Sequence, residues 1–190
     1  MNEPSQWSQD LHYVRDLVDP AARPGIPRSV MMIWAAIILI GFPLPDFVEQ
    51  GTVLLYWIIA GPIGFVLGAL LSARAMRRSG EHDVRTARRQ FAHWGILFLT
   101  GGLAILLPQT GNMSWQAIAP LMLLLVSFAY LLASIHIGLY FLGPGVIFAL
   151  GYCLLIYRVA FAWTIIGVLA ALAFVVSAEI GRRNRVVHTG

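Results

Sequence analysis

Six apolar segments follow one another along this chain, and each is long enough, or nearly so, to cross a bilayer. They cover residues 30–47, 52–73, 91–108, 115–137, 141–157 and 159–180. A hydrocarbon layer of about 30 Å needs about 20 helical residues at a rise of ~1.5 Å per residue. The chain is therefore predicted to be an all-α integral membrane protein with six transmembrane helices.

Composition agrees with a membrane protein and disagrees with a soluble domain. Hydrophobic residues make up 58% of the 190 residues and charged residues only 12%, and the mean hydropathy is +0.75, which lies outside the soluble range. The net charge of +4 does not indicate nucleic acid, because the basic residues flank the apolar segments. The first 28 residues show no cleavable signal, so the first span is expected to remain as an anchor.

The arginines predict the orientation of the spans. All thirteen basic residues are arginine, and an even number of spans places twelve of them on the side that holds both termini. Arginine concentrates on the cytoplasmic side of membrane proteins, so both termini are predicted to be cytoplasmic. Only Arg158, between the last two spans, falls on the other side. The predicted divisions are a cytoplasmic segment (1–28), a transmembrane domain (29–181) with an arginine-rich loop (74–90), and a cytoplasmic tail (182–190).

Tryptophans open the even-numbered spans, and a cation follows each about twenty residues later. The tryptophans are Trp57, Trp115 and Trp163, and the cations at +21, +21 and +20 are Arg78, His136 and Arg183. This register favours three antiparallel helical hairpins, with or without an ancestral duplication. It also aligns His136 with two arginines, as a cation at the negative end of a helix.

An amphipathic helix is predicted over residues 7–18. Trp7, Leu11, Val14 and Val18 fall on one helical face, and Pro20 ends the pattern. We expect this helix to lie on the cytoplasmic surface, either packed on the protein's own inner face or docking another protein.

Two sets of small residues predict helix contacts. One is Gly64, Gly68 and Ser72 in the second span, and the other is Gly167 and Ala171 in the sixth. Helices in lipid associate by close packing, which small residues permit. The expected partner is a neighbouring helix of the same chain, and a homodimer seam is the alternative.

Three ionisable residues near the ends of the spans are the candidate chemical groups. They are His93, His136 and Glu179, and ionisable groups within a membrane are functional candidates by default. One hypothesis is an ion or proton site, or a haem b or metal site that uses the two histidines. The favoured interpretation is interfacial: His136 as a helix-end cation, and Glu179 paired with Arg182 and Arg183 three and four residues later.

Motifs of known enzymes are missing from the chain. The sequence holds no phosphate loop, no H-E-x-x-H and no G-x-S-x-G, and its one cysteine, Cys153, excludes an internal disulfide. The turn with Pro43, Pro45 and Asp46 is expected to be a rigid turn or a binding loop. We therefore predict a protein that is not an enzyme and holds no metal or other cofactor.

The sequence favours a non-catalytic accessory or regulatory subunit that acts through helix and inner-face contacts. Its partners would be the lipid bilayer and a membrane protein or further copies of itself, without nucleic acid. Its location would be a cell membrane, in a bacterium the inner membrane. The alternatives are a small-solute or ion transporter or channel, and a haem-binding redox subunit that uses His93 and His136.

Overall fold

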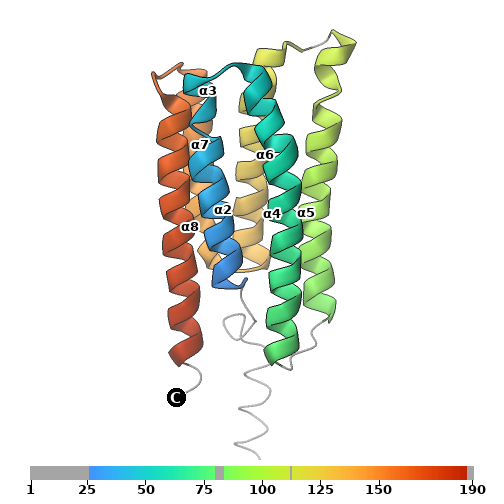
Figure 1. Cartoon of the computed structure of the whole chain (residues 1–190), viewed down its shortest axis with the longest axis vertical. Helices are drawn as coiled ribbons and strands as arrows, with labels where there is room; N and C mark the ends of the chain where they lie inside the picture. The colour runs from blue at the N-terminus through green and yellow to red at the C-terminus, as the bar shows by residue number, and fades with distance from the viewer. Residues whose placement is uncertain (1–25, 80–83, 112, 188–190) are drawn as a thin grey trace, which may run out of the picture.

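A computed structural model of the chain describes residues 26–79, 84–111 and 113–187 (Figure 1). Within these ranges every regular element is helical, and six helices are long and apolar enough to cross a membrane. The predicted all-α fold is therefore confirmed, and the six predicted spans correspond to six helices of suitable length and apolarity. The amphipathic helix predicted over residues 7–18 lies outside the described residues.

The element bounds follow the apolar segments closely. The elements are α2 (Arg28–Gly41), α3 (Leu44–Phe47), α4 (Gln50–Ser79), α5 (Val84–Ala104), η2 (Leu107–Thr110), α6 (Trp115–His136), η3 (Leu139–Phe141), α7 (Leu142–Ile156) and α8 (Ala162–Val187). Helices α4 and α8 continue beyond their apolar spans into arginine-rich sequence, where arginine is a good helix former. Pro62 and Pro120 lie inside α4 and α6, which run through them.

The first predicted span is two helices and not one. Helix α2 ends at Gly41, and the single turn α3 begins after Pro43. Proline has no N–H to donate and its ring clashes with the carbonyl four residues before it, so an uninterrupted helix through this position is disfavoured. The break turns the chain toward α4 and places Asp46 beside the start of α8.

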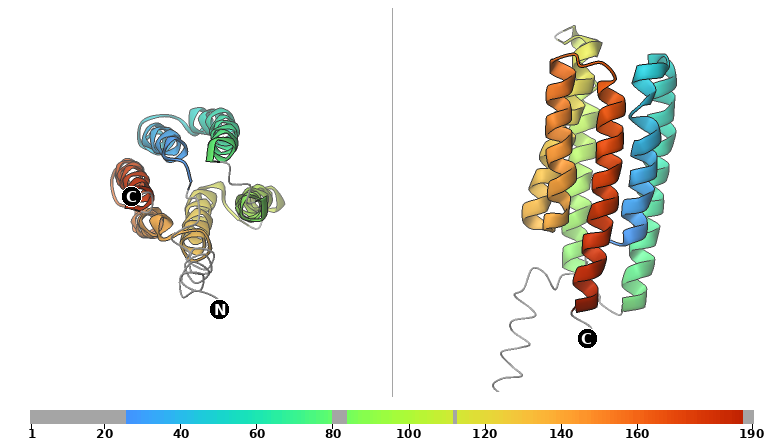
Figure 2. Two further views of the ribbon diagram at one scale, coloured as in Figure 1. Left: turned by 90° about the horizontal axis from the view of Figure 1, so that it is seen from below. Right: turned by 90° about the vertical axis from the view of Figure 1, so that its left-hand side faces the viewer.

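Four helices form the centre of the bundle, and two lie at its edge. The most extensive contacts join α6 to α7 and α2 to α8, followed by α7 to α8. Helix α4 packs on α2, and α5 packs on α6. Seen along the bundle axis in Figure 2, the helices therefore follow a curve in the order α4, α2, α8, α7, α6, α5.

Aromatic rings fill the centre between α6, α7 and α8. Tyr130 lies 5.7 Å from Phe141, 5.4 Å from Phe148 and 5.5 Å from Phe174, measured between ring centroids. Such pairs contribute about 0.5–1.5 kcal/mol each beyond the area that they bury. Ala133 and Ala170 are fully buried beside them, and their small side chains allow the helices to approach closely.

Hydroxyl groups link neighbouring helices through backbone carbonyls. The Tyr56 hydroxyl of α4 donates to the Ile37 carbonyl of α2 at 2.7 Å. Ser127 of α6 donates to the Gly145 carbonyl of α7 at 3.0 Å, and Ser177 of α8 donates to the Tyr140 carbonyl at 2.6 Å. Hydrogen bonds of this kind between transmembrane helices are worth about 0.6 kcal/mol on average.

The start of α8 is capped from a distant part of the chain. One oxygen of Asp46 accepts hydrogen bonds from the Thr164 backbone N–H and the Thr164 hydroxyl, both at 2.7 Å. Phe161, just before α8, has no side-chain oxygen that could cap the helix, and its φ is 53°. The Asp46 carboxylate supplies the missing acceptor and places a negative charge at the positive end of the helix.

Candidate functional site

His93 makes a hydrogen bond between α5 and α6. Its Nε2 lies 3.0 Å from the Ala129 carbonyl oxygen. A carbonyl oxygen only accepts, so Nε2 carries a proton and donates it in this hydrogen bond. The imidazole is half-buried, and its centroid lies 5.0 Å from that of Trp94. In this arrangement His93 holds α5 against the central helices.

His136 is the last residue of α6, and its side chain is exposed. His93 bonds to Ala129, about two turns before His136 on α6, so the two predicted histidines belong to the same end of the α5–α6 pair. Within the described ranges, no three His, Cys, Asp or Glu side chains gather into a set able to hold a metal ion.

Glu179 lies near the C-terminal end of the apolar part of α8 and contacts the start of α2. Its Oε2 is 3.5 Å from Nε of Arg28. The predicted partners Arg182 and Arg183 have side chains outside the described set. Both members of the observed pair are partly exposed, and pairs of this kind contribute about 0–1 kcal/mol. Sequence reasoning missed Arg28 because the pair depends on the contact between the first and last spans.

The small residues of α4, in the second span, face α2. A Cβ on Gly64 would lie 2.5 Å from Cδ1 of Ile37, and one on Gly68 would lie 3.4 Å from Cγ1 of Val30. Gly64 therefore cannot be enlarged unless Ile37 moves. Ser72, one turn further along, is half-buried. The stripe lies against a neighbouring helix of the same chain.

The small residues of the last span face the end of α2. A Cβ on Gly167 would lie 2.8 Å from Cβ of Phe42 and 3.1 Å from Cδ of Pro43. Ala171, one turn further along α8, is buried in the core. Glycine at position 167 is thus what allows α8 to approach the corner between α2 and α3.

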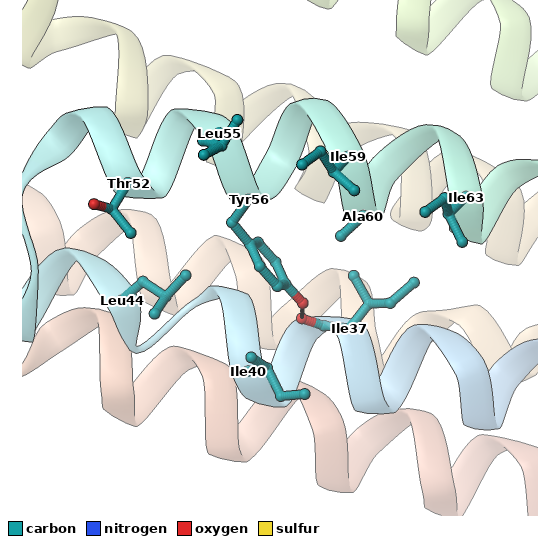
Figure 3. Close-up of a pocket in the computed structure, with 9 residues that line it drawn as sticks. All are labelled: Ile37, Ile40, Leu44, Thr52, Leu55, Tyr56, Ile59, Ala60 and Ile63. Atoms are coloured by element: carbon teal, nitrogen blue, oxygen red, sulfur yellow. Dashed lines mark hydrogen bonds between the residues drawn. The ribbon is translucent and has the colours of Figure 1, made fainter.

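Two shallow hollows lie on the outside of the bundle. The larger, about 490 Å³, lies between α2, α3 and α4 (Figure 3) and is lined by Ile37, Ile40, Leu44, Thr52, Leu55, Tyr56, Ile59, Ala60 and Ile63. The smaller, about 310 Å³, lies between η3, α7 and α8. In the larger hollow the Tyr56 hydroxyl points to the Ile37 carbonyl. Neither hollow includes His93, His136 or Glu179.

The geometry brings the two histidines to one end of the bundle. Tyr56, Ser127, Ser177 and His93 each make a hydrogen bond to a backbone carbonyl of another element. Comparisons with protein families, with curated proteins and with solved structures found no match for this chain. A functional proposal therefore depends on the surfaces that the bundle leaves uncovered.

Proposed function

We propose that this protein is a non-catalytic accessory or regulatory subunit that binds a membrane protein partner along α4 and α5. The observation that carries the proposal is the uneven burial of the six spans. In the most apolar stretch of α4 only 11% of residues are buried, and in that of α5 only 6%, against 28–39% in the other four spans. The four central helices pack against one another, whereas α4 packs mainly on α2 and α5 mainly on α6.

The uncovered faces of α4 and α5 support contact with another helix. Ile58 and Leu70 of α4 are 60% and 62% exposed, and Ile96 of α5 is 62% exposed. Gly95 and Gly102 lie seven residues apart on α5, and a Cβ on either would meet nothing within 4 Å. Glycines in front of open space let a second helix approach a transmembrane helix closely.

The polar groups of the spans support a structural rather than a chemical role. Tyr56, Ser127 and His93 each donate to a carbonyl of an adjacent helix. Thr100 donates to carbonyls of its own helix. A transporter usually gathers polar groups or broken helices near the midplane, whereas these four side chains donate to backbone carbonyls.

The proposed orientation places both termini in the cytoplasm, with the chain arranged as three hairpins. Helix α2 begins and α8 ends at the same end of the bundle (Figure 1), and the arginine-rich end of α4 and start of α5 lie at that end too. Arginine excess favours the cytoplasmic side. Helical spans also favour the inner membrane in a bacterium, since outer-membrane proteins are barrels. Activity of a periplasmic reporter fused to either terminus would contradict this orientation.

Purification from native membranes tests the proposed function. The full chain would be isolated under gentle solubilisation, and the co-purifying chains identified by mass spectrometry. We expect a stoichiometric membrane partner, and we expect Gly95→Leu with Gly102→Leu to reduce its recovery about tenfold or more, because added bulk blocks close approach. The matched control is Val176→Phe, an exposed position on α8, which should retain the partner.

The outcome distinguishes this proposal from the other functions. A chain that purifies alone and folded would overturn the accessory role. A Soret band in the purified protein, after growth with ample haem, would instead support haem ligation by His93 and His136. Solute uptake by liposomes that hold the pure chain would support a transporter.

A further inference from the structure

Four arginine side chains lie exposed at the same end of α4 and α5, two helices whose side chains meet at Phe65. Arg74 and Arg77 are near the end of α4, and Arg88 and Arg89 are near the start of α5. The ion pair found among the described residues, between Arg28 and Glu179, does not involve them. From residue 74 to residue 89 the sequence holds six arginines against two acidic residues, so this end of the bundle is strongly positive.

The contacts of Phe65 place the four arginines at similar depth. The Phe65 ring lies 6.1 Å from Phe91 and 5.3 Å from Phe98 between centroids, so position 65 of α4 is level with the middle of 91–98 on α5. The two helices run antiparallel (Figure 1). At ~1.5 Å per residue, the four arginines then fall within about 10 Å of one another along the bundle axis.

This depth corresponds to the surface of the membrane. The apolar span of α4 ends at Ala75, and that of α5 begins at Arg88. The arginines therefore occupy the region of the lipid headgroups, where phosphate groups lie. A guanidinium binds a phosphate through two parallel N–H···O bonds, which makes arginine better suited to this contact than lysine.

An apolar aromatic surface continues from the arginines toward the membrane centre. Phe91 is 65% exposed and lies one turn beyond Arg88, and Phe98 is 51% exposed and lies two turns further on. Both rings contact Phe65 across the helix pair. Such a surface can hold the hydrocarbon chain of a lipid. A free anion such as inorganic phosphate has no hydrocarbon chain and would gain nothing from it.

We propose that the inner end of the α4–α5 pair is a binding site for an anionic phospholipid. The phosphate is held by Arg74, Arg77, Arg88 and Arg89, and an acyl chain lies against Phe91 and Phe65. Basic groups between transmembrane helices on the cytoplasmic side bind anionic headgroups in this way. The site belongs to the single chain and does not depend on the proposed accessory function.

Lipid binding by the purified full chain tests the site. Native mass spectrometry would measure retention of cardiolipin, phosphatidylglycerol and phosphatidylcholine added at equal concentration. The test variant changes all four arginines to lysine, which keeps the charge that orients the chain but removes the two-pronged contact. The control is Arg158→Lys, an exposed arginine in the turn before α8.

We expect the wild-type chain and the Arg158→Lys control to retain the anionic lipids about tenfold better than phosphatidylcholine, because only the anionic lipids carry a net negative charge. We expect the four-lysine variant to retain about tenfold less anionic lipid than the wild type, since the loss of one strong charged hydrogen bond corresponds to a factor of about ten or more. Phe91→Ala should weaken retention of lipid without abolishing it. Equal retention by wild type and the four-lysine variant would overturn the site and leave the arginines a role in orientation alone. Displacement of the lipid by an equal concentration of inorganic phosphate would show binding of the anion only, and would likewise overturn it.

Discussion

The contact between Asp46 and Thr164 offers the sharpest test of how this bundle is held together. Asp46 belongs to α3, the single turn at the end of the first span, and Thr164 belongs to the first turn of the last span. One carboxylate oxygen accepts two hydrogen bonds of 2.7 Å, so removing the carboxylate breaks both at once. The substitution Asp46→Ala also removes the negative charge at the start of α8.

The magnitude follows from these contacts. A hydrogen bond to a charged group is worth about 1.5–3 kcal/mol, and a charge at a helix end about 0.3–1 kcal/mol. Because Asp46 is partly exposed and water replaces part of the loss, we expect Asp46→Ala to lower the free energy of unfolding by about 2–4 kcal/mol. Thr164→Val removes the hydroxyl bond and keeps the N–H bond, so about 1 kcal/mol is expected.

The assay is reversible unfolding in mixed micelles of mild detergent and sodium dodecyl sulfate, followed by far-ultraviolet circular dichroism. A double-mutant cycle of Asp46→Ala and Thr164→Val should give a coupling energy of about 1 kcal/mol, since neighbours that share a bond are not additive. Glu49→Ala, an exposed acidic residue in the same turn, is the matched control and should stay within about 0.5 kcal/mol of wild type. The reasoning is refuted if Asp46→Ala behaves like Glu49→Ala, or if the cycle shows no coupling.

Three further predictions use the same unfolding assay. Gly64→Leu should destabilise the bundle by about 1–3 kcal/mol, because its Cβ would overlap a side chain of α2 and overpacking has that typical cost; Gly61→Leu, with nothing within 4 Å, should not, and equal losses would contradict the packing. Tyr56→Phe should cost about 0.6 kcal/mol, since it removes only the donor to the α2 carbonyl, and an unchanged stability would show that this bond adds nothing. Arg28→Gln should cost less than about 1 kcal/mol, because the ion pair with Glu179 is partly exposed; a larger loss that salt does not diminish would be inconsistent with such a pair.

The helix-packing residues were predictable, but their partners were not. Small residues at intervals of three or four indicated a contact face on α4 and α8, and the structure places Gly64 against Ile37 and Gly167 against Phe42. Spacing along one helix says which of its faces is small. It does not say which other helix fills the space in front of that face.

The candidate site shows the same limit. The sequence identified His93, His136 and Glu179 as unusual groups for a membrane span. It did not identify the Ala129 carbonyl as the acceptor for His93, or Arg28 as a partner of Glu179. From the sequence, the arginines of the α4–α5 end indicated only the orientation of the chain. The contacts of Phe65 with Phe91 and Phe98, which place these arginines at similar depth, could not be predicted from the sequence.

The sequence by itself determined that the chain is helical and that it has six membrane spans, because the transfer of an apolar segment into lipid depends on local composition and length. The tertiary structure decided which spans lie side by side. Within the membrane all six are similarly apolar, so hydrophobicity does not select neighbours, and shape and single hydrogen bonds do. That is why Asp46 meets Thr164 and α2 lies against α8, and why α4 and α5 are left at the edge with their outer faces uncovered.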